Sequence, residues 1–486
     1  MRKYSTLKSL ILLGLLAFGR THAKIITYPA PDGEPLSEDY QLEVDGEAVD
    51  IYVARVTDVE DPPGWAIKPG QLGGPYSFAY FDMFGTVTVK IKSLKKPLHK
   101  LVIRPQFYGI DPKIKGNTIT FTLKKPTKLS IEPDGRFEPL LLFANPVETD
   151  PPQRGDPNVI YFGPGIHKQR DIRLNTGQTL YLAGGAIVKG SIDIENSRDV
   201  TIRGRGILCG NDWPWRKGPG NMIGIRQSSR IDIEGIILRG AWGWTLVPRH
   251  CDTVTVTNIK LCNSKNPNDD GINPVNSQHV TIRDCFIRTD DDCIALKGVS
   301  FVEGRNNNVE YITVEDCLLW SDRARIFLLG HESRAEFMRF IKLRNLHILH
   351  QSLTPFLFEP GEEMAIEDVL VENVDINAEY WKPNNATAQF RNWEFITLRP
   401  VVNQYMHNKV PGRISNVLFR NVALDGAKEK GGYHIWIQGQ PNNHGVSEIS
   451  FENVTWFGQR LKSNSPQLRI EGNTQNIRFL AGATNP

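Results

Sequence analysis

The length, composition and charge of the chain narrow its class before any motif is considered. The sequence has 486 residues, of which 40% are hydrophobic and 9% aromatic, and its formal net charge is +3. A chain of this size can bury a sizeable core and is too long for one ordinary compact domain. Because Lys and Arg form no concentrated stripe, the charge argues against a nucleic-acid partner.

The first 23 residues have the features of a secretory signal peptide. Three basic residues within the first eight precede an apolar run over residues 10–18, and Thr21-His22-Ala23 offers a small-x-small cleavage site. The apolar run is too short to span a bilayer, and no later segment reaches the roughly 18 consecutive apolar residues of a spanning helix. The sequence therefore predicts a cleaved signal peptide over 1–23, a secreted or periplasmic protein, and no membrane insertion.

Residues 24–150 are predicted to form a small β-sandwich module. Short β-prone segments recur there at roughly ten-residue intervals and are separated by Pro and Gly turns, which is typical of antiparallel sandwiches. These segments cover residues 49–56, 86–94, 100–106, 118–125 and 128–133. The Pro-rich stretch 149–157 reads as a linker, and a second domain is expected over 158–486.

This second domain carries an eight-residue pattern of apolar and polar alternation that returns nine times. The pattern begins at residues 200, 231, 254, 280, 312, 341, 369, 417 and 449. The intervals between these starts are 31, 23, 26, 32, 29, 28, 48 and 32 residues. A period in the twenties with occasional insertions indicates a solenoid.

The composition of the repeat indicates which kind of solenoid it builds. The segments are rich in β-branched residues and show no helical period, so each repeat is predicted to be a coil of short strands. Coils of this kind stack into parallel sheets, and Asn or Asp at the fifth position suits a bend with left-handed backbone. The 48-residue interval, which holds Trp381–Arg391, is predicted to leave the solenoid as a loop and to wall a binding cleft.

Clustered acidic residues form the strongest local signal. Asn268-Asp269-Asp270-Gly271 is followed by Asp290-Asp291-Asp292-Cys293, and Asp270 precedes Asp291 by 21 residues, close to one coil. The carboxylates are therefore expected side by side on adjacent coils. Because like charges repel, at least one should hold a proton near neutral pH, which supplies the acid and the base that glycoside hydrolysis needs.

The same acidic cluster has two simpler interpretations, a calcium site and a set of solvated bend residues. The one-coil separation inside a solenoid favours catalysis over both. No Cys or His has the spacing of a metal site, so neither a metal nor a cofactor is predicted. Most of the six Cys residues fall in strand-like repeats, which favours packing as small apolar side chains over disulfides.

The acidic motifs resemble those of a known family. Asn268-x-Asp270-Gly271 is similar to the NTDG element, and Asp291-Asp292-Cys293 to the DDC element, of the polygalacturonase family, glycoside hydrolase family 28. The likeness extends from about residue 160 to about 460, and the module in front of the solenoid also resembles the dextranase family, glycoside hydrolase family 49.

The resemblance implies an all-β fold, a right-handed parallel β-helix of the pectin-lyase-like type after a β-sandwich. It implies inverting hydrolysis without a metal, with Asp291 as the general acid and with Asp270 and Asp292 activating the water. Asn268 is implied to bind substrate or to position a carboxylate.

Two departures from family 28 concern substrate recognition. The Gly-His-Gly element has no clean counterpart, because the matching coil over residues 321–332 offers Arg323 and His331 as alternative substitutes. The Arg-Ile-Lys element that grips a uronate carboxylate is replaced over 355–359 by a stretch without a cation. The sugar at the cleaved bond is therefore not required to be a uronic acid.

Further substrate-binding candidates follow the acidic motifs or lie in nearby turns. Lys297 suits binding substrate or tuning the pKa of an Asp, with a surface position in the stack as the alternative. His331 and Glu332 suit hydrogen bonding to sugar hydroxyls, although a structural role for His331 is the alternative, and Trp244 suits stacking on a sugar ring. Other Trp residues in turns could join such a surface, namely Trp213, Trp215, Trp242 and Trp381.

These features favour a secreted, inverting, polygalacturonase-like hydrolase of a polysaccharide or oligosaccharide. The alternatives are a dextranase-like hydrolase of a neutral α-glucan, a polysaccharide lyase, and a carbohydrate-binding solenoid. The sugar, the linkage, endo or exo action, the disulfide state and the oligomeric state stay open.

Overall fold

The computed structural model describes residues 24–56, 74–95, 97–98, 100–133, 135–378, 394–426 and 434–481. Over these ranges the fold is all-β, with one 3-10 turn, η1 (Gln106–Tyr108), and the predicted fold class is confirmed. No helix within the described ranges is long and apolar enough to cross a membrane. The predicted signal peptide and the loop Trp381–Arg391 lie outside the described residues.

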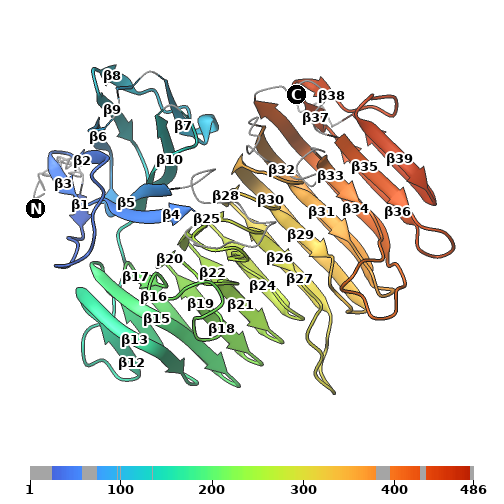
Figure 1. Cartoon of the computed structure of the whole chain (residues 1–486), viewed down its shortest axis with the longest axis horizontal. Coiled ribbons are helices and arrows are strands. Elements are labelled where there is room, and N and C mark those ends of the chain that lie inside the picture. The colour runs from blue at the N-terminus through green and yellow to red at the C-terminus, as the bar shows by residue number, and fades with distance from the viewer. Residues whose placement is uncertain are drawn as a thin grey trace, which may run out of the picture.

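The amino-terminal module consists of two sheets that face each other (Figure 1). One sheet contains β1 (Lys24–Thr27), β4 (Tyr52–Val56), β5 (Gly74–Phe84), β7 (Leu101–Arg104), β10 (Thr127–Pro133) and β11 (Leu140–Pro146). The other contains β2 (Tyr40–Val44), β3 (Glu47–Val49), β6 (Val87–Ser93), β8 (Lys113–Lys115) and β9 (Thr118–Leu123). Strand β6 alternates buried and exposed residues, as a strand with one face on a core does.

Strand β5 differs from β6 because both of its faces are buried. Ala79 and Phe81 point into the core between the two sheets of the module. Phe78 and Tyr80 point the other way and pack against apolar residues of the second domain, among them Phe286. A nearly continuous apolar run in β5 therefore joins the module to the domain that follows.

Buried ion pairs also tie the module to the second domain. The guanidinium of Arg205 lies 2.9 Å from Asp82, and that of Arg239 lies 2.5 Å from Glu34. Arg136 of the module reaches Asp322 of the second domain at 3.1 Å. Breaking a buried pair by removing one partner costs about 3 to 5 kcal/mol, so these contacts hold the two domains in a fixed arrangement.

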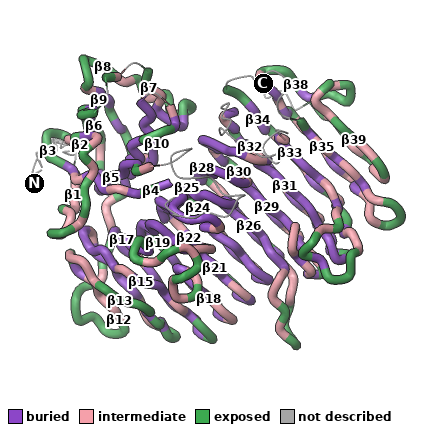
Figure 2. The backbone as a smooth tube through the Cα atoms, in the orientation of Figure 1, coloured by how far each residue is buried: buried purple, intermediate pink, exposed green. Residues whose placement is uncertain are grey.

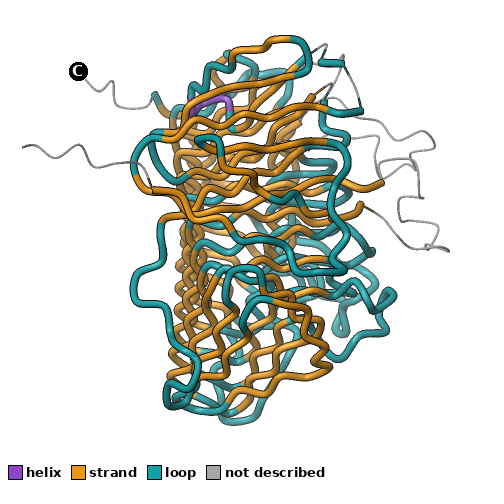
Figure 3. Tube along the Cα trace, turned by 90° about the vertical axis from the view of Figure 1, so that its left-hand side faces the viewer, coloured by secondary structure: helices purple, strands orange, loops and turns teal. Residues whose placement is uncertain are grey.

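The second domain is a right-handed parallel β-helix with three faces, whose coils run from green at the lower left of Figure 1 to red at the right. It begins with β12 (Val159–Phe162), which pairs with β14, and β13 (Gly165–Leu174), which pairs with β15. The described residues 147–158, between β11 and β12, form no strand. Figure 3, turned by 90°, shows the strands as stacked layers.

The three faces are parallel stacks of strands. The first contains β14 (Thr179–Leu182), β16 (Arg198–Gly204), β19 (Ser229–Glu234), β22 (Asp252–Thr257), β24 (Gln278–Arg283), β27 (Val309–Glu315), β30 (Phe337–His350), β32 (Ala365–Ala378), β34 (Arg413–Gly426), β36 (Val446–Glu452) and β40 (Thr474–Leu480). The second contains the first part of β15 (Ala186–Glu195), whose later part pairs with β18 of the third face, and then β17 (Ile207–Cys209), β20 (Ile237–Arg239), β23 (Lys260–Cys262), β25 (Phe286–Thr289), β28 (Leu318–Ser321), the later halves of β30, β32 and β34, and β37 (Thr455–Trp456), beside which lies β38 (Gln459–Arg460). The third contains β18 (Ile223–Arg226), β21 (Leu246–Arg249), β26 (Ile294–Leu296), β29 (Phe327–Gly330), β31 (Phe356–Glu359), β33 (Glu394–Leu398), β35 (His434–Gly439) and β39 (Leu468–Gly472).

The fifth position of each repeat lies at the bend between the first and second faces. All nine residues at this position have positive φ; seven are Asn or Asp, as the pattern predicted, and two are Gly: Gly204, Gly235, Asn258, Asp284, Asp316, Asn345, Asn373, Asn421 and Asn453. Short polar side chains and glycine tolerate left-handed backbone best. The residue two positions before the bend lies in the apolar core in all nine coils, and the residue after the bend does so in all but the first.

The interior of the β-helix is a single apolar core that runs its length, shown as buried segments in Figure 2. Stacked Ile, Leu, Val and Phe side chains fill it, and all six Cys residues are buried and free, as their position in the repeats predicted. The continuous core fixes the coils in register, and with them the side chains that each coil presents outward.

Candidate active site

The clustered acidic residues lie on the third face of the β-helix, in its central coils. Bridges between Leu246 and Ile272 and between Ile272 and Ile294 set the register of this face, and Ile294 pairs with Phe327. Two residues before these positions on successive coils stand Trp244, Asp270, Asp292 and Arg325. The structure therefore brings the two acidic motifs together on adjacent coils.

All nine predicted site residues line one cleft with a volume of about 980 Å³. They are Trp244, Asn268, Asp270, Asp291, Asp292, Lys297, Arg323, His331 and Glu332. A cleft of this volume has room for several sugar units, and its lining is rich in charged and aromatic groups.

Asp291 is held as a carboxylate by three donors. It accepts hydrogen bonds from Nη2 of Arg323 at 2.8 Å, from Nδ2 of Asn268 at 3.1 Å and from the backbone N–H of Asp292 at 3.0 Å. Burial alone would raise the pKa of Asp291, but the positive charges of Arg323, Arg325 and Lys297 outweigh it and lower that pKa. In the free cleft Asp291 is therefore ionised.

Asp270 has the opposite behaviour. Its carboxylate accepts a hydrogen bond from Nδ2 of Asn273 at 2.9 Å and lies 3.8 Å from Nζ of Lys297. Burial, followed by the negative charge of Asp291, raises the pKa of Asp270 well above its ordinary value. Burial also raises the pKa of Asp292, although the backbone N–H of Arg325 donates to it at 3.0 Å.

The pKa values of two cleft carboxyl groups are thus shifted in opposite directions, in an order different from the one that the resemblance implies. The pKa is raised at Asp270 and lowered at Asp291, whereas the resemblance implies that Asp291 is the acid. Of the three carboxyl groups, Asp291 is the most exposed, at 9%, compared with 2% for Asp270 and 2% for Asp292. Asp291 is the carboxyl group that a glycosidic oxygen reaches most readily.

Asp290 and Asp291 lie in a bend, where strand alternation does not set the direction of side chains. A bend separates β25, which ends at Thr289, from β26, which begins at Ile294. Within this bend Arg323 contacts both carboxylates, with Nε 2.9 Å from Asp290 and Nη2 2.8 Å from Asp291. Asp290 is 1% exposed and does not line the cleft, and burial raises its pKa to about 7.

Lys297, Glu332 and Trp244 form one cluster beside Asp270. Nζ of Lys297 lies 2.5 Å from Glu332 and 4.5 Å from the centre of the Trp244 ring. Burial opposes the charged form of Lys297, but Glu332 and Asp270 raise its pKa, so it stays a cation. The cluster places a cation, an acceptor and an aromatic ring within reach of the same sugar.

The two candidates for the missing family His have different surroundings. Arg323 contacts Asp291 directly, whereas Nδ1 of His331 bonds Glu359 at 2.7 Å and its ring lies 5.4 Å from that of Tyr405. Glu359 also contacts Arg399. The coil expected to carry the uronate-binding cation therefore has a carboxylate instead, which is buried and does not line the cleft.

Several cleft residues carry no sequence signal that would have singled them out. Nη2 of Arg216 donates to Asn268 at 2.8 Å, and Asn403 and Tyr405 reach the cleft from the segment between β33 and β34. Both segments lack a repeat pattern. Arg325 could have been predicted from the sequence. It stands two residues after Arg323, and residues two apart in an alternating segment face the same side; both line the cleft.

The predicted Trp surface reduces largely to Trp244. Trp242 is 2% exposed, and its indole N–H donates to Gly220 at 2.9 Å. Trp213 packs against Trp242 with ring centres 5.0 Å apart, and Trp381 lies outside the described residues. Within the described ranges, no group of three or more His, Cys, Asp or Glu side chains is arranged to hold a metal ion.

Comparison with known sequences supports the resemblance over part of the chain. Residues 181–317, which include Asp270, Asp291 and Asp292, match the model of Glycosyl hydrolases family 28. A probable polygalacturonase of Vitis vinifera is 32% identical over 77 residues, 16% of this chain and 16% of its own length. An exopolygalacturonase, clone GBGE184, of Arabidopsis thaliana is 34% identical over 98 residues, 20% of this chain and 21% of its own length. The match thus spans about a fifth or less of these two relatives.

Comparison with solved structures extends over nearly the whole chain. Dex49A from Penicillium minioluteum superimposes with a TM-score of 0.59 at 16% identity, covering 93% of this chain and 96% of Dex49A. The family 28 exopolygalacturonase of Yersinia enterocolitica gives 0.50 at 13% identity, covering 94% and 96%. At these identities the likeness is one of fold, and its coverage includes the amino-terminal module. The resemblance to family 28 is confirmed in sequence over 181–317.

Proposed function

We propose that the protein is a polygalacturonase-like glycoside hydrolase that cleaves polysaccharide or oligosaccharide with inversion, using Asp270, Asp291 and Asp292. One observation carries the proposal: three carboxylates from adjacent coils line one cleft, and their pKa values are shifted in opposite directions. Such a split is what acid and base catalysis of hydrolysis requires. The protein is exported through the signal peptide 1–23, which sequencing of the exported amino terminus tests.

The proposed mechanism begins with a proton on Asp270. The carboxyl groups titrate as a set, because the charge of each shifts the pKa of the next. Sugar bound in the cleft excludes water from Asp291, which favours its neutral form, and the proton passes from Asp270 to Asp291. This transfer leaves Asp270 as a base at the moment that Asp291 becomes an acid.

Bond cleavage then uses the two sides of the cleft. Asp270 and Asp292 deprotonate a water that attacks the anomeric carbon, while Asp291 protonates the departing glycosidic oxygen. The products are an inverted hemiacetal and a free hydroxyl group. Lys297, Glu332 and Trp244 hold the sugar, and Asn268 and Arg323 position Asp291.

Arg216 and Arg325 support an acidic sugar as the substrate, because guanidinium groups bind carboxylates well. One observation favours a neutral α-glucan as the second candidate. Lys297 is already paired with Glu332, Arg323 with Asp291, and Arg325 lies 3.6 Å from Asp292. A cation that is already paired with a carboxylate of the protein binds a substrate carboxylate more weakly.

A glycan panel analysed by mass and by ultraviolet absorbance tests the reaction class. Hydrolysis adds water to the products, lysis leaves an absorbing double bond, and a binding solenoid gives no product. We expect added water, and activity that survives EDTA, because the cleft carboxylates are balanced by Arg and Lys side chains. Absorbing products, with activity lost to EDTA and restored by calcium, would identify a lyase.

The stereochemistry of the product gives an independent prediction. Inverting enzymes hold their acid and base about 6.5 to 9.5 Å apart so that a water fits between them. We therefore expect the first product to have the opposite anomeric configuration from the substrate. Proton NMR of the reaction within its first minutes measures this configuration. Retention of configuration would rule out direct attack of water on the anomeric carbon.

A further inference from the structure

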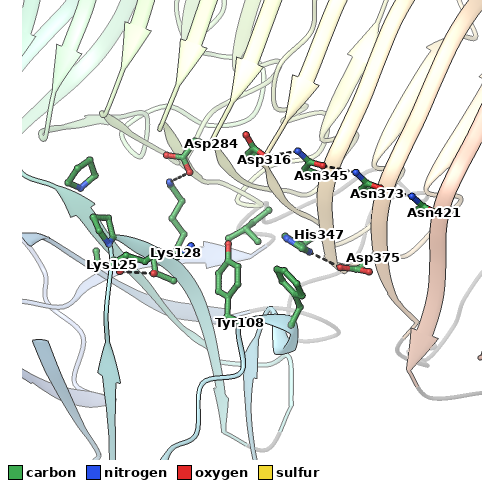
Figure 4. A pocket seen from close by; sticks show the side chains of 16 residues that line it. Tyr108, Lys125, Lys128, Asp284, Asp316, Asn345, His347, Asn373, Asp375 and Asn421 are labelled. Carbon is green, nitrogen blue, oxygen red and sulfur yellow. Dashed lines mark hydrogen bonds and ion pairs between the residues drawn. The ribbon is translucent and has the colours of Figure 1, made fainter. Parts of the chain in front are cut away.

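A second cavity, of about 590 Å³, lies where the amino-terminal module meets the bend between the first and second faces of the β-helix. It shares no lining residue with the active-site cleft. The module contributes η1 and the start of β10, and the β-helix contributes the row of fifth-position residues (Figure 4). This cavity, called here the module groove, has no role in the proposed hydrolysis.

Aromatic rings line one side of the module groove. Phe107 is 73% exposed and Tyr108 is 36% exposed, both on η1, which Gly109 caps with a φ of 59°. The ring of His347 stacks on Phe107 at 5.1 Å and 25°, and meets Tyr108 edge-on at 5.9 Å. A single exposed ring is ordinary, but adjacent rings at the mouth of a concave site indicate a ligand.

Amides line the opposite side in a regular row. Asn345 donates to Asp316 at 3.1 Å, Asn373 to Asn345 at 3.1 Å and Asn421 to Asn373 at 3.0 Å. These links stabilise the stack of coils and use one N–H of each amide, although an amide has two. Because adjacent strands lie about 4.8 Å apart, the row offers polar groups at regular intervals along the long axis of the β-helix. This arrangement suits a linear chain of hydroxyl-bearing units.

The charges of the module groove favour a neutral ligand. Lys128 is paired with Asp284 at 2.7 Å, and His347 with Asp375 at 3.1 Å. The remaining charged lining residues are Lys125 and Asp316, so the groove has no excess of cations. Burial, then the carboxylates of Asp284 and Asp316, raises the pKa of Tyr108, which keeps its phenol a neutral hydrogen-bond donor.

We propose that the module groove is an accessory binding site for a neutral oligosaccharide segment, stacked on Phe107 and Tyr108 and hydrogen-bonded along the amide row. Aromatic rings suit the apolar face of a pyranose, and amides suit its hydroxyl groups. The site needs neither the cleft nor the hydrolytic reaction. It would hold a polymer on the protein beside the bond-cleaving cleft.

Affinity gel electrophoresis tests the site without relying on hydrolysis. The wild-type protein is run in gels containing dextran, galactan or xyloglucan, and in a gel containing polygalacturonate. We expect at least one neutral polymer to retard it, and Phe107→Ala to weaken that binding about tenfold, equivalent to about 1.4 kcal/mol. Because Phe107 is 73% exposed, its removal leaves the core unchanged.

Two control variants separate binding in the module groove from binding elsewhere on the protein. Phe84→Ala removes a comparable ring, 56% exposed at the end of β5 and outside the module groove, and should be retarded like the wild type. Asp291→Asn should also be retarded like the wild type in the neutral gels, which separates this result from failure of the proposed hydrolysis.

Three outcomes would overturn the proposal. These are the absence of retardation by every neutral polymer, equal retardation of wild type and Phe107→Ala, and retardation by polygalacturonate alone. Self-association of the wild type that Phe107→Ala abolishes, without retardation by glycan, would instead assign the groove to contact with a second copy of the chain.

Discussion

Replacing Asp291 with Asn is expected to lower turnover by about 10² to 10⁴-fold without unfolding the protein. Asn has nearly the shape of Asp but cannot deliver a proton, so the departing oxygen loses its acid. Its side-chain oxygen still accepts the hydrogen bond from Arg323, which also keeps its contact with Asp290. Turnover is measured on the polymer that the glycan panel identifies, and folding by thermal melting.

The leaving group separates the acid from the base. An aryl glycoside with an acidic phenol departs without protonation, so Asp291→Asn should regain most of its activity on such a substrate. Asp270→Asn should stay slow on both substrates, because the water still needs a base. The reverse pattern, with Asp270→Asn rescued and Asp291→Asn not rescued, would make Asp270 the acid, as its raised pKa in the free cleft suggests.

Asp290→Asn is the matched control for this prediction. Asp290 is adjacent in sequence and shares Arg323 with Asp291, but it does not line the cleft. Its replacement should lower turnover far less than that of Asp291. Equal losses in the two variants would mean that Asp291 acts through Arg323 and not on the substrate.

The repeats are the part of the fold that local chemistry predicts best. Alternation fixes which residues face the core, and Asn, Asp or Gly occupies the fifth position at each bend. The placement of the two acidic motifs on adjacent coils therefore follows from their distance in sequence. The sandwich was predictable for the same reason, since β6 alternates regularly. The packing of the amino-terminal module against the β-helix could not be predicted in this way. Both faces of β5 are apolar, and alternation does not say which face packs against the other sheet of the module and which against the β-helix.

The site was predictable only where a residue lies on a coil. Asp291 and Lys297 follow from the register, but the bend after Thr289 removes the alternation that would have turned Asp290 away. Trp242 packs into the core with 2% of its surface exposed, although its turn resembles that of the more exposed Trp244, because tertiary packing and not local sequence decides how far each ring is covered. Which carboxyl group of the cleft has the lowered pKa depends on Arg323, which pairs with Asp291 but lies a full coil away in sequence.

Arg323→Gln is expected to destabilise the protein by about 3 to 5 kcal/mol near neutral pH. Arg323 is 8% exposed, and its guanidinium contacts the buried carboxylates of Asp290 and Asp291. Gln can donate one hydrogen bond but carries no charge, so both carboxylates lose their nearest cation. Arg230→Gln is the matched control, because Arg230 pairs with Asp199 at 2.6 Å on the exposed surface, where an ion pair adds little.

The destabilisation should depend on pH in a definite direction. In the wild type the pKa of Asp291 is lowered, so its ionised form stabilises the fold above the ordinary Asp pKa of about 3.9, and this contribution is lost as the pH falls through the lower folded value. Without Arg323 the pKa of Asp291 should rise above that of the unfolded chain, because burial then outweighs the two remaining cations, Arg325 and Lys297. The ionised form then costs stability at neutral pH, and the cost fades as the pH falls towards about 4 and the carboxyl group takes up a proton. Urea unfolding of wild type and Arg323→Gln at neutral pH and at about pH 4 measures the difference between their free energies of unfolding. This difference should be smaller at the lower pH. Arg323 does not hold Asp291 in its ionised state if this difference is larger at the lower pH. The same conclusion follows if, at neutral pH, Arg323→Gln loses no more free energy of unfolding than Arg230→Gln does.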